Sequence, residues 1–503
     1  MNYRKYLYGT FLTAALLSCS DMEEQPYGII NSTTFYKTPE DAESAIVYCY
    51  SILPEVGYYS RGYTIVTELP TENLTQKGDA GTSNFELDEL RTTATNSNLD
   101  DMWTYIYRGI SRANGVITNV PNIAMNQTTR DQIVGEAYFL RALHYFNLVR
   151  MFGEVPIRLQ TIDTPTQIPL AKSPVKDVYD LIIADLKQSE QLITVPRISE
   201  GRANKVAAQG LLAKVYLHLA SSKSSASPGY EFVSNADEMY TQAAAYAGKV
   251  VNEQTTFAFT DNLVDIWNTE IYKKAAVSEH IFDAAVDRSG DREGSFSKLP
   301  NMFLPADRPM EIVYNPSDPA SAKINIGQGW SHFRTEANLY NNYADDDKRK
   351  TDLIVSKYWN AGTEYNLDIT SSSRPFTRKY IDPLRIGDAS SCNTPIVRYS
   401  DILLVYAEGV GPTTEGYAAI NKIRARAGVG DLAPGLSVDA FRKAVVEERA
   451  NELAFEGNRL FDLRRTNSME EVLVNKYGKT ITSGAYFFPI PQREIDTNPL
   501  MKP

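Results

Sequence analysis

Cysteine is scarce in this 503-residue chain, which contains only Cys19, Cys49 and Cys392. If Cys19 has another use, one pair remains, so disulfide bonds do not form the scaffold of the fold. Cys49 lies within the apolar run 45–50 and is predicted to be a buried thiol rather than a reactive one.

Histidine is almost as scarce, and the usual motifs of cofactor and nucleophile sites are missing. The chain has no P-loop, no G-x-G-x-x-G and no G-x-S-x-G sequence. The sequence therefore indicates no nucleotide site and no serine-hydrolase nucleophile, and we expect no cofactor. The four histidines are far apart, without the spacing of zinc ligands, at His144, His218, His280 and His332.

The acidic triplet 345–347 is the only stretch that suggests a metal, because oxygen-rich loops bind calcium. Lys348 and Arg349 follow at once, however, and the glycine-punctuated spacing of a calcium loop is absent. We interpret the triplet as a solvated turn and predict no metal site.

Positive charge is also limited. The chain has 51 Lys and Arg against 62 Asp and Glu, a net charge of −11, and the basic residues are dispersed. An acidic chain without a basic stripe lacks the electrostatic footprint of a nucleic-acid-binding protein, so no nucleic-acid partner is expected. No segment after residue 18 approaches 18 uncharged apolar residues, so no membrane-spanning helix is predicted.

The first 19 residues do carry a pattern. Arg4 and Lys5 precede a mostly apolar, uncharged stretch over 6–17, and small residues then lead to Cys19. This is a secretory signal, too short to span a bilayer. Because it ends at a cysteine, it resembles a bacterial lipobox, which implies a signal peptide over 1–18 and a lipidated Cys19 that anchors the protein to a membrane.

Residues 19–26 are polar and acidic, and are predicted to form a tether rather than part of a fold. Acidic residues directly after a lipidated cysteine resemble the export signal of some Gram-negative surface lipoproteins. The resemblance implies a lipoprotein of the outer membrane that faces the cell exterior.

Most of the remaining chain is typical of amphipathic helices, with apolar residues three or four apart. Ala-rich faces alternate with Tyr- and Leu-rich faces, a style that resembles tetratricopeptide-type repeats. Helices are expected from Pro39 with Thr38 as N-cap, from near Asp100, over 131–152, from Ser173, and over 203–219, 237–251, 396–408, 416–427 and 438–456.

The texture divides the chain into three regions. Helical patterns fill 27–254 and 391–503, whereas 255–390 is rich in Gly, Pro, Asn and Ser and is predicted to be a loop-rich insert with short strands. We expect one integrated globular unit over 27–503. The Pro-broken segment 486–491 is expected to dock in an extended form.

Several long motifs resemble those of the SusD/RagB family of outer-membrane glycan-binding lipoproteins, and the match covers nearly all of the mature chain. The resemblance implies a mainly α, SusD-like fold on a tetratricopeptide-type helical scaffold. The motifs lie at 135–142, 152–156, 178–186, 395–408, 421–428 and 447–465.

The resemblance also implies a function without catalysis. Such proteins capture oligo- or polysaccharides and deliver them to a SusC-like TonB-dependent transporter, so a glycan ligand and that transporter are the expected partners. Two alternatives stay open: capture of peptides or glycopeptides with the same transporter architecture, and a hydrolase with paired carboxylates.

The family motifs are rich in arginine and glutamate, which we interpret as structural ion pairs. Glu448, Glu452 and Glu456 share one helix face, a like-charge row that requires guanidinium groups from other elements. Carboxylates surrounded by arginines should be held ionised, which argues against a glycosidase acid. The arginines concerned are Arg141, Arg398, Arg424, Arg449 and Arg459.

Sugars present apolar faces rimmed by hydroxyls, so they are held by aromatic rings beside polar side chains. By the resemblance, Glu72 and Asn73 occupy a position that often lines the glycan site. Trp103 and Trp267 are expected to be core, whereas for Tyr58, Trp330 and Trp359 core and ligand-stacking roles both stay open. The candidate glycan-binding residues are Tyr58, Tyr59, Tyr63, Glu72, Asn73, Phe85, Trp330 and Trp359.

Overall fold

The computed structural model describes residues 35–162, 164–194, 200–291, 293–482 and 485–501. The predicted signal peptide, Cys19 and the predicted tether lie outside these ranges. Within them, no helix combines the length and the apolar character needed to cross a bilayer.

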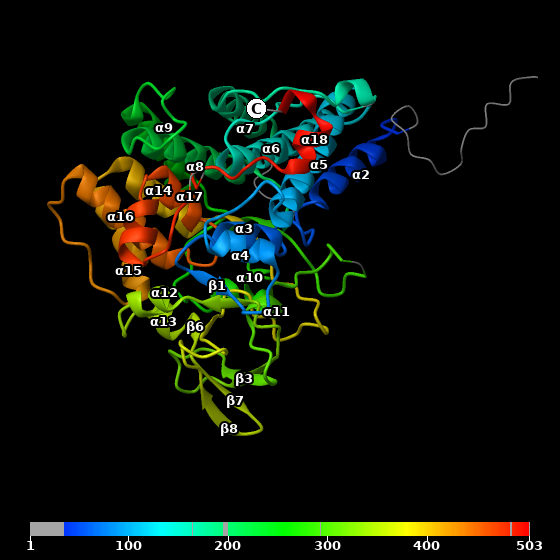
Figure 1. Cartoon of the computed structure of the whole chain (residues 1–503). Helices are drawn as coiled ribbons and strands as arrows, with labels where there is room; N and C mark the ends of the chain where they lie inside the picture. The colour runs from blue at the N-terminus through cyan, green and yellow to red at the C-terminus, as the bar shows by residue number, and fades with distance from the viewer. Residues whose placement is uncertain (1–34, 163, 195–199, 292, 483–484, 502–503) are drawn as a thin grey trace, which may run out of the picture.

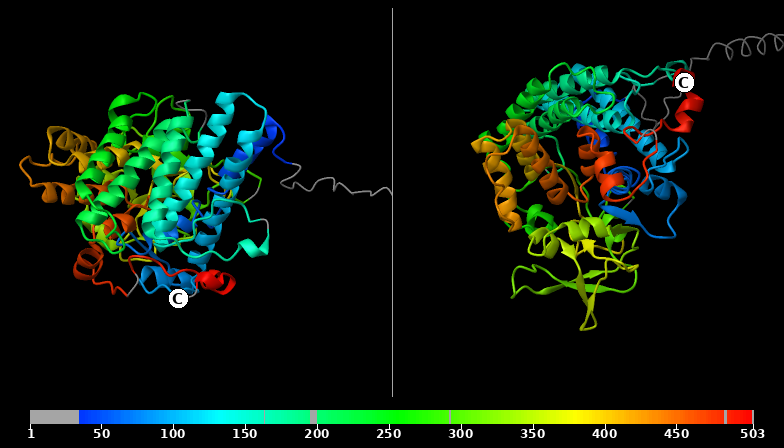
Figure 2. Two further views of the ribbon diagram at one scale, coloured as in Figure 1. Left: turned by 90° about the horizontal axis from the view of Figure 1, so that it is seen from above. Right: turned by 60° about the vertical axis from the view of Figure 1, so that its left-hand side comes forward.

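Long helices form one side of the molecule, where they lie side by side (Figures 1 and 2). Each packs against the next along the chain, as the repeat-like pattern predicts. In order they are α2 (Pro39–Tyr50), α5 (Ser97–Asn119), α6 (Gln127–Phe152), α7 (Val175–Leu192), α8 (Lys205–Ser224) and α9 (Ala236–Gly248).

Local sequence signals explain where these helices begin and end. Thr38 caps α2, as expected from the sequence, and also forms a capping box with Asp41. Gly153 ends α6 with a φ of 74°, a backbone conformation that glycine adopts at little cost. The C-terminal helices continue the stack, with α14 (Tyr399–Val410) on α9, followed by α15 (Thr414–Ala427), α16 (Val438–Glu452) and α17 (Arg459–Arg465).

Several predicted helix boundaries were wrong. Helix α6 begins at Gln127 rather than at 131, and α8 ends at Ser224 rather than at 219. Residues 396–398 belong to β10 (Thr394–Arg398), which pairs antiparallel with β2 (His280–Ala284) before α14 begins. The last long helix was expected to reach 456 but ends at Glu452, because Phe455 and Gly457 have φ values of 70° and 74°. A positive φ cannot continue a right-handed helix.

The region 255–390 forms a β-rich end below the helices (Figure 1). Its largest sheet has the order β4 (Lys323–Gly327), β3 (Met310–Val313), β7 (Lys357–Asn360) and β8 (Thr363–Asn366), with antiparallel neighbours. Two small sheets pair β1 (Leu74–Gln76) with β5 (Phe333–Thr335) and β6 (Ile354–Val355) with β9 (Phe376–Thr377). Short helices connect the rest: α3 (Gly62–Glu68), α4 (Thr82–Asp88), α10 (Thr269–Tyr272), α11 (Leu299–Phe303), α12 (Ala337–Asn342), α13 (Lys348–Thr351) and α18 (Gln492–Thr497).

One large apolar core contains residues from all three sequence regions, and a separate small core lies under the four-stranded sheet. Trp103 and Trp267 are buried, as predicted, and so are the thiols of Cys49 and Cys392. The extended segment near Phe488 docks on the helices, where its backbone N–H donates to Met151 O at 2.7 Å. The chain is therefore mainly α, with a β-rich end.

The arginines of the family motifs form buried ion pairs, as predicted, mostly with carboxylates from other elements. Arg398 contacts Glu279, Glu452 and Glu456, and Arg349 forms an ion pair with Glu448. Other pairs join Arg141 to Asp185, Arg202 to Glu136, Arg424 to Glu448, Arg449 to Asp401 and Asp462, Arg459 to Glu72, and Arg465 to Glu408.

The acidic triplet is only partly a solvated turn. Asp345 and Asp346 are exposed, but Asp347 is buried, caps α13 and pairs with Arg349 at 2.7 Å. Among the described residues, no group of three His, Cys, Asp or Glu side chains is placed to hold a metal ion.

Candidate functional site

The tyrosines after α2 were expected in a loop where their rings reach a ligand, but they are buried. Tyr58 is 0 % exposed and Tyr59 is 2 % exposed, so neither ring offers a face to solvent. Asn147 of α6 donates to both hydroxyls, at 2.8 and 2.7 Å, and Tyr63 stacks on Tyr59. The prediction that these rings stack on a ligand was wrong, because α6 supplies partners that turn them inward.

Glu72 and Asn73 are also buried, and both act in the fold. Glu72 pairs with Arg459 of α17 at 2.6 Å, and Asn73 Nδ2 donates to Glu68 at 2.8 Å. Both border a polar cavity of about 260 Å³ whose other walls include Asn342 of α12. Both residues precede β1, whereas the partly exposed aromatic rings lie near the other end of that strand.

Trp330 lies in a loop whose backbone is tightly held. Its N–H donates to Asn301 O at 2.6 Å, and the flanking N–H groups of Gly329 and Ser331 donate to Pro305 O and Leu304 O. A Cβ atom at position 329 would lie 2.6 Å from the Asn301 and Leu304 carbonyl oxygens, so only glycine fits there. The loop is therefore preorganised, while the indole itself is only partly buried.

The approach to this loop is fixed as well. Gly327, with a φ of 68°, ends β4, and the guanidinium of Arg385 packs against its α-carbon. Arg385 donates to the backbone oxygen of Gln328 and to the side chain of Asn301. The contacts join the loop to α11 and hold the indole in a defined position.

Polar side chains surround the indole because β1 and β5 pair. The register continues past the strand ends, where Lys77 N donates to His332 O at 3.2 Å. The His332 ring lies edge-on to the Trp330 ring, with centroids 6.1 Å apart. Partial burial and the positive charges of Lys77 and Arg61 hold the pKa of His332 below its ordinary value, so at neutral pH the imidazole can both donate and accept a hydrogen bond.

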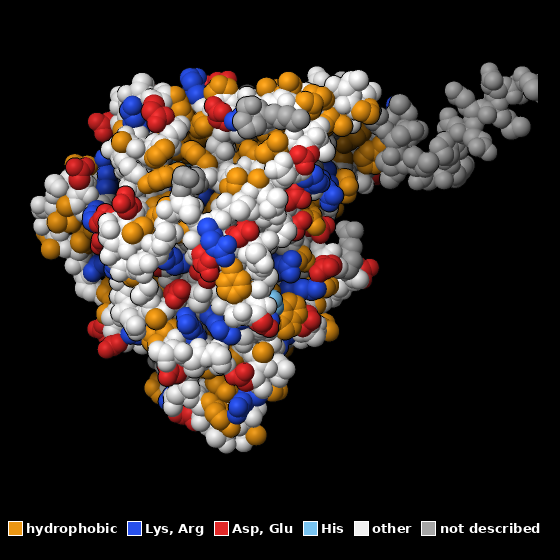
Figure 3. Space-filling view, viewed as in Figure 1, with side chains coloured by type: hydrophobic (Ala, Val, Ile, Leu, Met, Phe, Trp, Pro, Cys, Tyr) orange, Lys and Arg blue, Asp and Glu red, His pale blue; other side chains and the backbone are white. Residues whose placement is uncertain are grey.

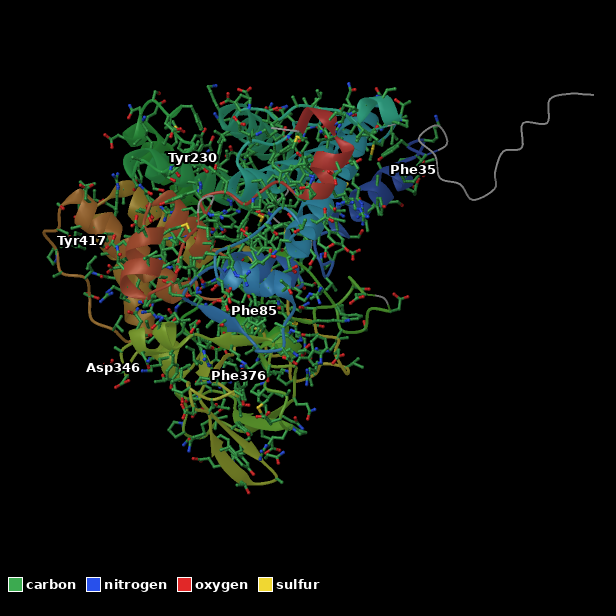
Figure 4. The ribbon with its side chains drawn as sticks, viewed as in Figure 1. Phe35, Phe85, Tyr230, Asp346, Phe376 and Tyr417 are labelled. Carbon is green, nitrogen blue, oxygen red and sulfur yellow. The ribbon has the colours of Figure 1, made fainter. Side chains whose placement is uncertain are left out.

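Phe85 lies on α4, directly after β1, at the front of the view in Figure 4. Its ring is partly buried. The helix is held against β1 by a hydrogen bond from Thr75 Oγ1 to Asp88 at 2.6 Å. In Figure 3, hydrophobic and basic side chains lie next to each other in the middle of this face.

The residues Phe85, Trp330, His332 and Lys77 define what we call the front surface. It combines partly exposed rings with donors and acceptors on a fixed backbone, which suits a ligand with both apolar faces and hydroxyl groups. Lys77 and His332 were not among the predicted glycan-binding residues, because only the pairing of β1 with β5 brings these distant positions together.

Trp359, the last candidate, is elsewhere. It lies on β7 in the four-stranded sheet and is paired with Glu311 of β3 and Glu364 of β8. The predicted set is therefore divided between the core (Tyr58, Tyr59, Tyr63), an ion-paired region (Glu72, Asn73), the front surface (Phe85, Trp330) and the sheet (Trp359).

The buried carboxylates are arranged for structure. Two arginines, Arg426 and Arg398, lower the pKa of Glu279 to about 2 despite its burial, and arginine neighbours also lower the pKa of Glu452. Burial instead raises the pKa of Glu136 and of Asp185, and it raises the pKa of Glu68 to about 7. The Glu68 carboxylate accepts hydrogen bonds from Asn73 and from the Gly457 backbone, which places it inside the fold.

Two family models match this chain. Residues 42–217 match a family model described as starch-binding associating with outer membrane, and residues 354–502 match the model of the SusD family. A SusD-like protein, P2, of Formosa agariphila is 27% identical, with 98% of this chain and 97% of that protein covered.

Solved structures show the same fold. A SusD homologue from Bacteroides thetaiotaomicron superposes with a TM-score of 0.77 at 20% identity, covering 94% of this chain and 97% of that one. Surface glycan-binding protein A from the same organism, solved in complex with laminarihexaose, gives a TM-score of 0.71 at 22% identity, with 92% and 98% covered.

Proposed function

Because the chain belongs to the SusD/RagB family, we propose that it is a non-catalytic cell-surface protein that captures oligo- or polysaccharides for a TonB-dependent outer-membrane transporter. The observation that carries the proposal is the front surface, where the Trp330 indole is presented on a pinned loop beside His332. Stacked rings bind the apolar face of a sugar, and the neighbouring polar groups bind its hydroxyls.

The first ligand class to test is a β-glucan. Surface glycan-binding protein A from Bacteroides thetaiotaomicron, which shares this fold, was solved with laminarihexaose. We propose that this chain binds a polysaccharide, with Phe85 and Trp330 as the stacking rings.

The anchor is proposed from the sequence, since Cys19 lies outside the described residues. Lipidation of Cys19 would hold the protein to the outer membrane, with the tether over 19–26 leading to the first described residues.

Support for a protein partner comes from the helical side. Leu159, Ile162 and Ile168 are 48%, 45% and 37% exposed, and the two isoleucines border a cavity of about 330 Å³ between α5 and α18. Exposed apolar clusters of this kind mark interaction sites. The transporter is the partner that we propose for this side.

A glycan array with the purified protein, followed by titration calorimetry with the glycans retained, tests the proposal. Binding of a polysaccharide that is clearly weaker in Trp330→Ala supports it, and retention of peptides instead would favour peptide capture. Release of new reducing ends during incubation would show a hydrolase. Affinity purification from native membranes should recover a TonB-dependent barrel.

A further inference from the structure

The outer face of the four-stranded sheet carries an ordered row of side chains. Asn325 of β4 lies opposite Glu311 of β3, which lies opposite Trp359 of β7, which lies opposite Glu364 of β8. Directly opposed residues in antiparallel strands point to the same face. The row therefore crosses all four strands, and three interstrand spacings make it about 14 Å long.

Burial separates the two faces of this sheet. The residues that alternate with the row, among them Met310, Ile312 and Tyr358, belong to the small core. Asn325 and Glu364 are exposed, and Glu311 and Trp359 are partly exposed. The row thus faces outward while the opposite face is packed, which fixes the orientation of Trp359.

The charges on this outer face balance. Lys357 pairs with Glu364 at 3.0 Å, and the Lys323 ammonium lies 4.1 Å from the centre of the Trp359 ring. With Glu311, the face has two carboxylates and two ammonium groups around one indole. Such a face has no net charge to attract a polyanion or a polycation.

We propose that this outer face, which we call the sheet platform, is a second binding surface for a neutral polysaccharide, separate from the front surface. The proposal rests on the proposed function and extends it to a second contact on the same polymer. A flat face with a central indole and a row of amide and carboxylate groups matches an extended chain of sugar rings with equatorial hydroxyls. The scattered charges and the single ring suit it less to a protein partner, whose interface core is depleted of charge.

The two surfaces are built independently. Trp330 packs against the main core, whereas Trp359 lies over the separate core of the sheet. Lys323 covers the indole and swings aside when a sugar stacks on it. A polymer that reaches both surfaces gains avidity, because binding at one raises the effective concentration at the other.

The test measures binding of laminarihexaose and of laminarin. If the glycan array selects another polysaccharide, that polymer and its hexasaccharide take their place. Calorimetry of the native protein should show two hexasaccharide sites. Trp359→Ala should leave one, and its apparent affinity for the polysaccharide should fall about tenfold while the front-surface affinity stays unchanged. Glu364→Gln, a milder change at an exposed residue of the same row, should weaken the second site without unfolding the protein.

Tyr48→Ala is the matched control, because Tyr48 is an exposed ring of α2 with the guanidinium of Arg112 3.7 Å from its centre. It should keep both sites. Lys323→Ala should also keep both, since the lysine only covers the ring.

Two outcomes overturn the platform. One is a single site in the native protein that Trp330→Ala abolishes and Trp359→Ala leaves intact, a result under which the proposed function stands. The other is loss of the second site in Lys323→Ala together with a lower melting temperature. That result would mean that the contact between Lys323 and the Trp359 ring stabilises the fold. Absence of glycan binding by the native protein would refute the proposed function itself.

Discussion

Arg398 and Glu456 form a two-point pair inside the protein: Nε donates to Oε2 and Nη2 donates to Oε1, each at 2.9 Å. Arg398 ends β10, Glu456 follows α16, and the same guanidinium contacts Glu279 beside β2. Through Glu279, the Arg398 guanidinium therefore connects the insert region to the C-terminal segment that holds Glu456. The many charges of the family motifs therefore have a structural role.

Replacing Arg398 should be strongly destabilising. Arg398→Met would leave Glu279, Glu452 and Glu456 short of positive charge in the interior, and breaking a buried pair in this way costs about 3–5 kcal/mol. Urea unfolding followed by circular dichroism measures the loss.

Arg493→Met is the control for Arg398→Met, because its pair with Asp100 is exposed and should contribute at most about 1 kcal/mol. Equal losses in the two variants would contradict a structural role for the buried cluster.

Glu68 should make the fold less stable as pH rises. Burial raises its folded pKa to about 7, above its ordinary value of 4.5. Between these values the folded state binds more protons than the unfolded state, so the free energy of unfolding falls as pH rises, by up to about 3 kcal/mol in total. Above pH 7 the loss of stability from ionising the buried Glu68 carboxyl is fully present, and below pH 4.5 it is absent.

Glu68→Gln removes this titration. The variant should gain stability relative to the native protein between pH 5 and pH 8, measured as the difference of their urea-unfolding free energies at each pH. Glu89→Gln, an exposed change, controls for the lost charge. A difference that does not vary with pH would show that Glu68 is ionised in the fold at both values.

The sequence was enough for the helices, whose apolar spacing is local, and for a structural role of the arginines. It was not enough for the partners of these arginines, because most of them lie on other elements, as Asp185 does for Arg141. It was not enough for the tyrosines. A cluster of aromatics looks the same whether the rings face solvent or core, and the partner that buries Tyr58 and Tyr59 is Asn147, almost ninety residues away. His332 could not be predicted as a site residue for the same reason, because it reaches the front surface only through strand pairing with the segment of Lys77.

Trp330 and Tyr59 should therefore behave in opposite ways. Trp330→Ala should cost about 2 kcal/mol of glycan binding, as truncation of a central aromatic contact does, with little change in melting temperature. Tyr59→Ala removes a ring that is 2 % exposed and should cost about 3–5 kcal/mol of stability. Calorimetric titration and thermal melting of both variants separate the roles. Early melting with normal binding in Trp330→Ala would place that ring in the core.

Cys19→Ala should release the protein from the membrane. In the described residues no helix is able to span a bilayer, so the proposed acyl chains are the expected attachment. Cell fractionation with a salt wash, compared with Cys49→Ala as a buried-thiol control, measures this. A Cys19→Ala protein that stays in the membrane fraction would argue against the anchor, and protection of the native protein from protease on intact cells would place it in the periplasm.

Gly329→Ala tests whether the backbone of the Trp330 loop contributes to binding. The added methyl would lie 2.6 Å from the Asn301 and Leu304 carbonyl oxygens, so the loop must move and the indole with it. Because affinity depends on a preorganised ring, we expect at least a tenfold weaker glycan affinity even though Trp330 is still present. Gly362→Ala is the control for a new methyl at a loop glycine, since a Cβ there has nothing within 4 Å, although its φ of 82° adds local strain. Normal binding by Gly329→Ala would mean that the ring finds its ligand without a fixed loop.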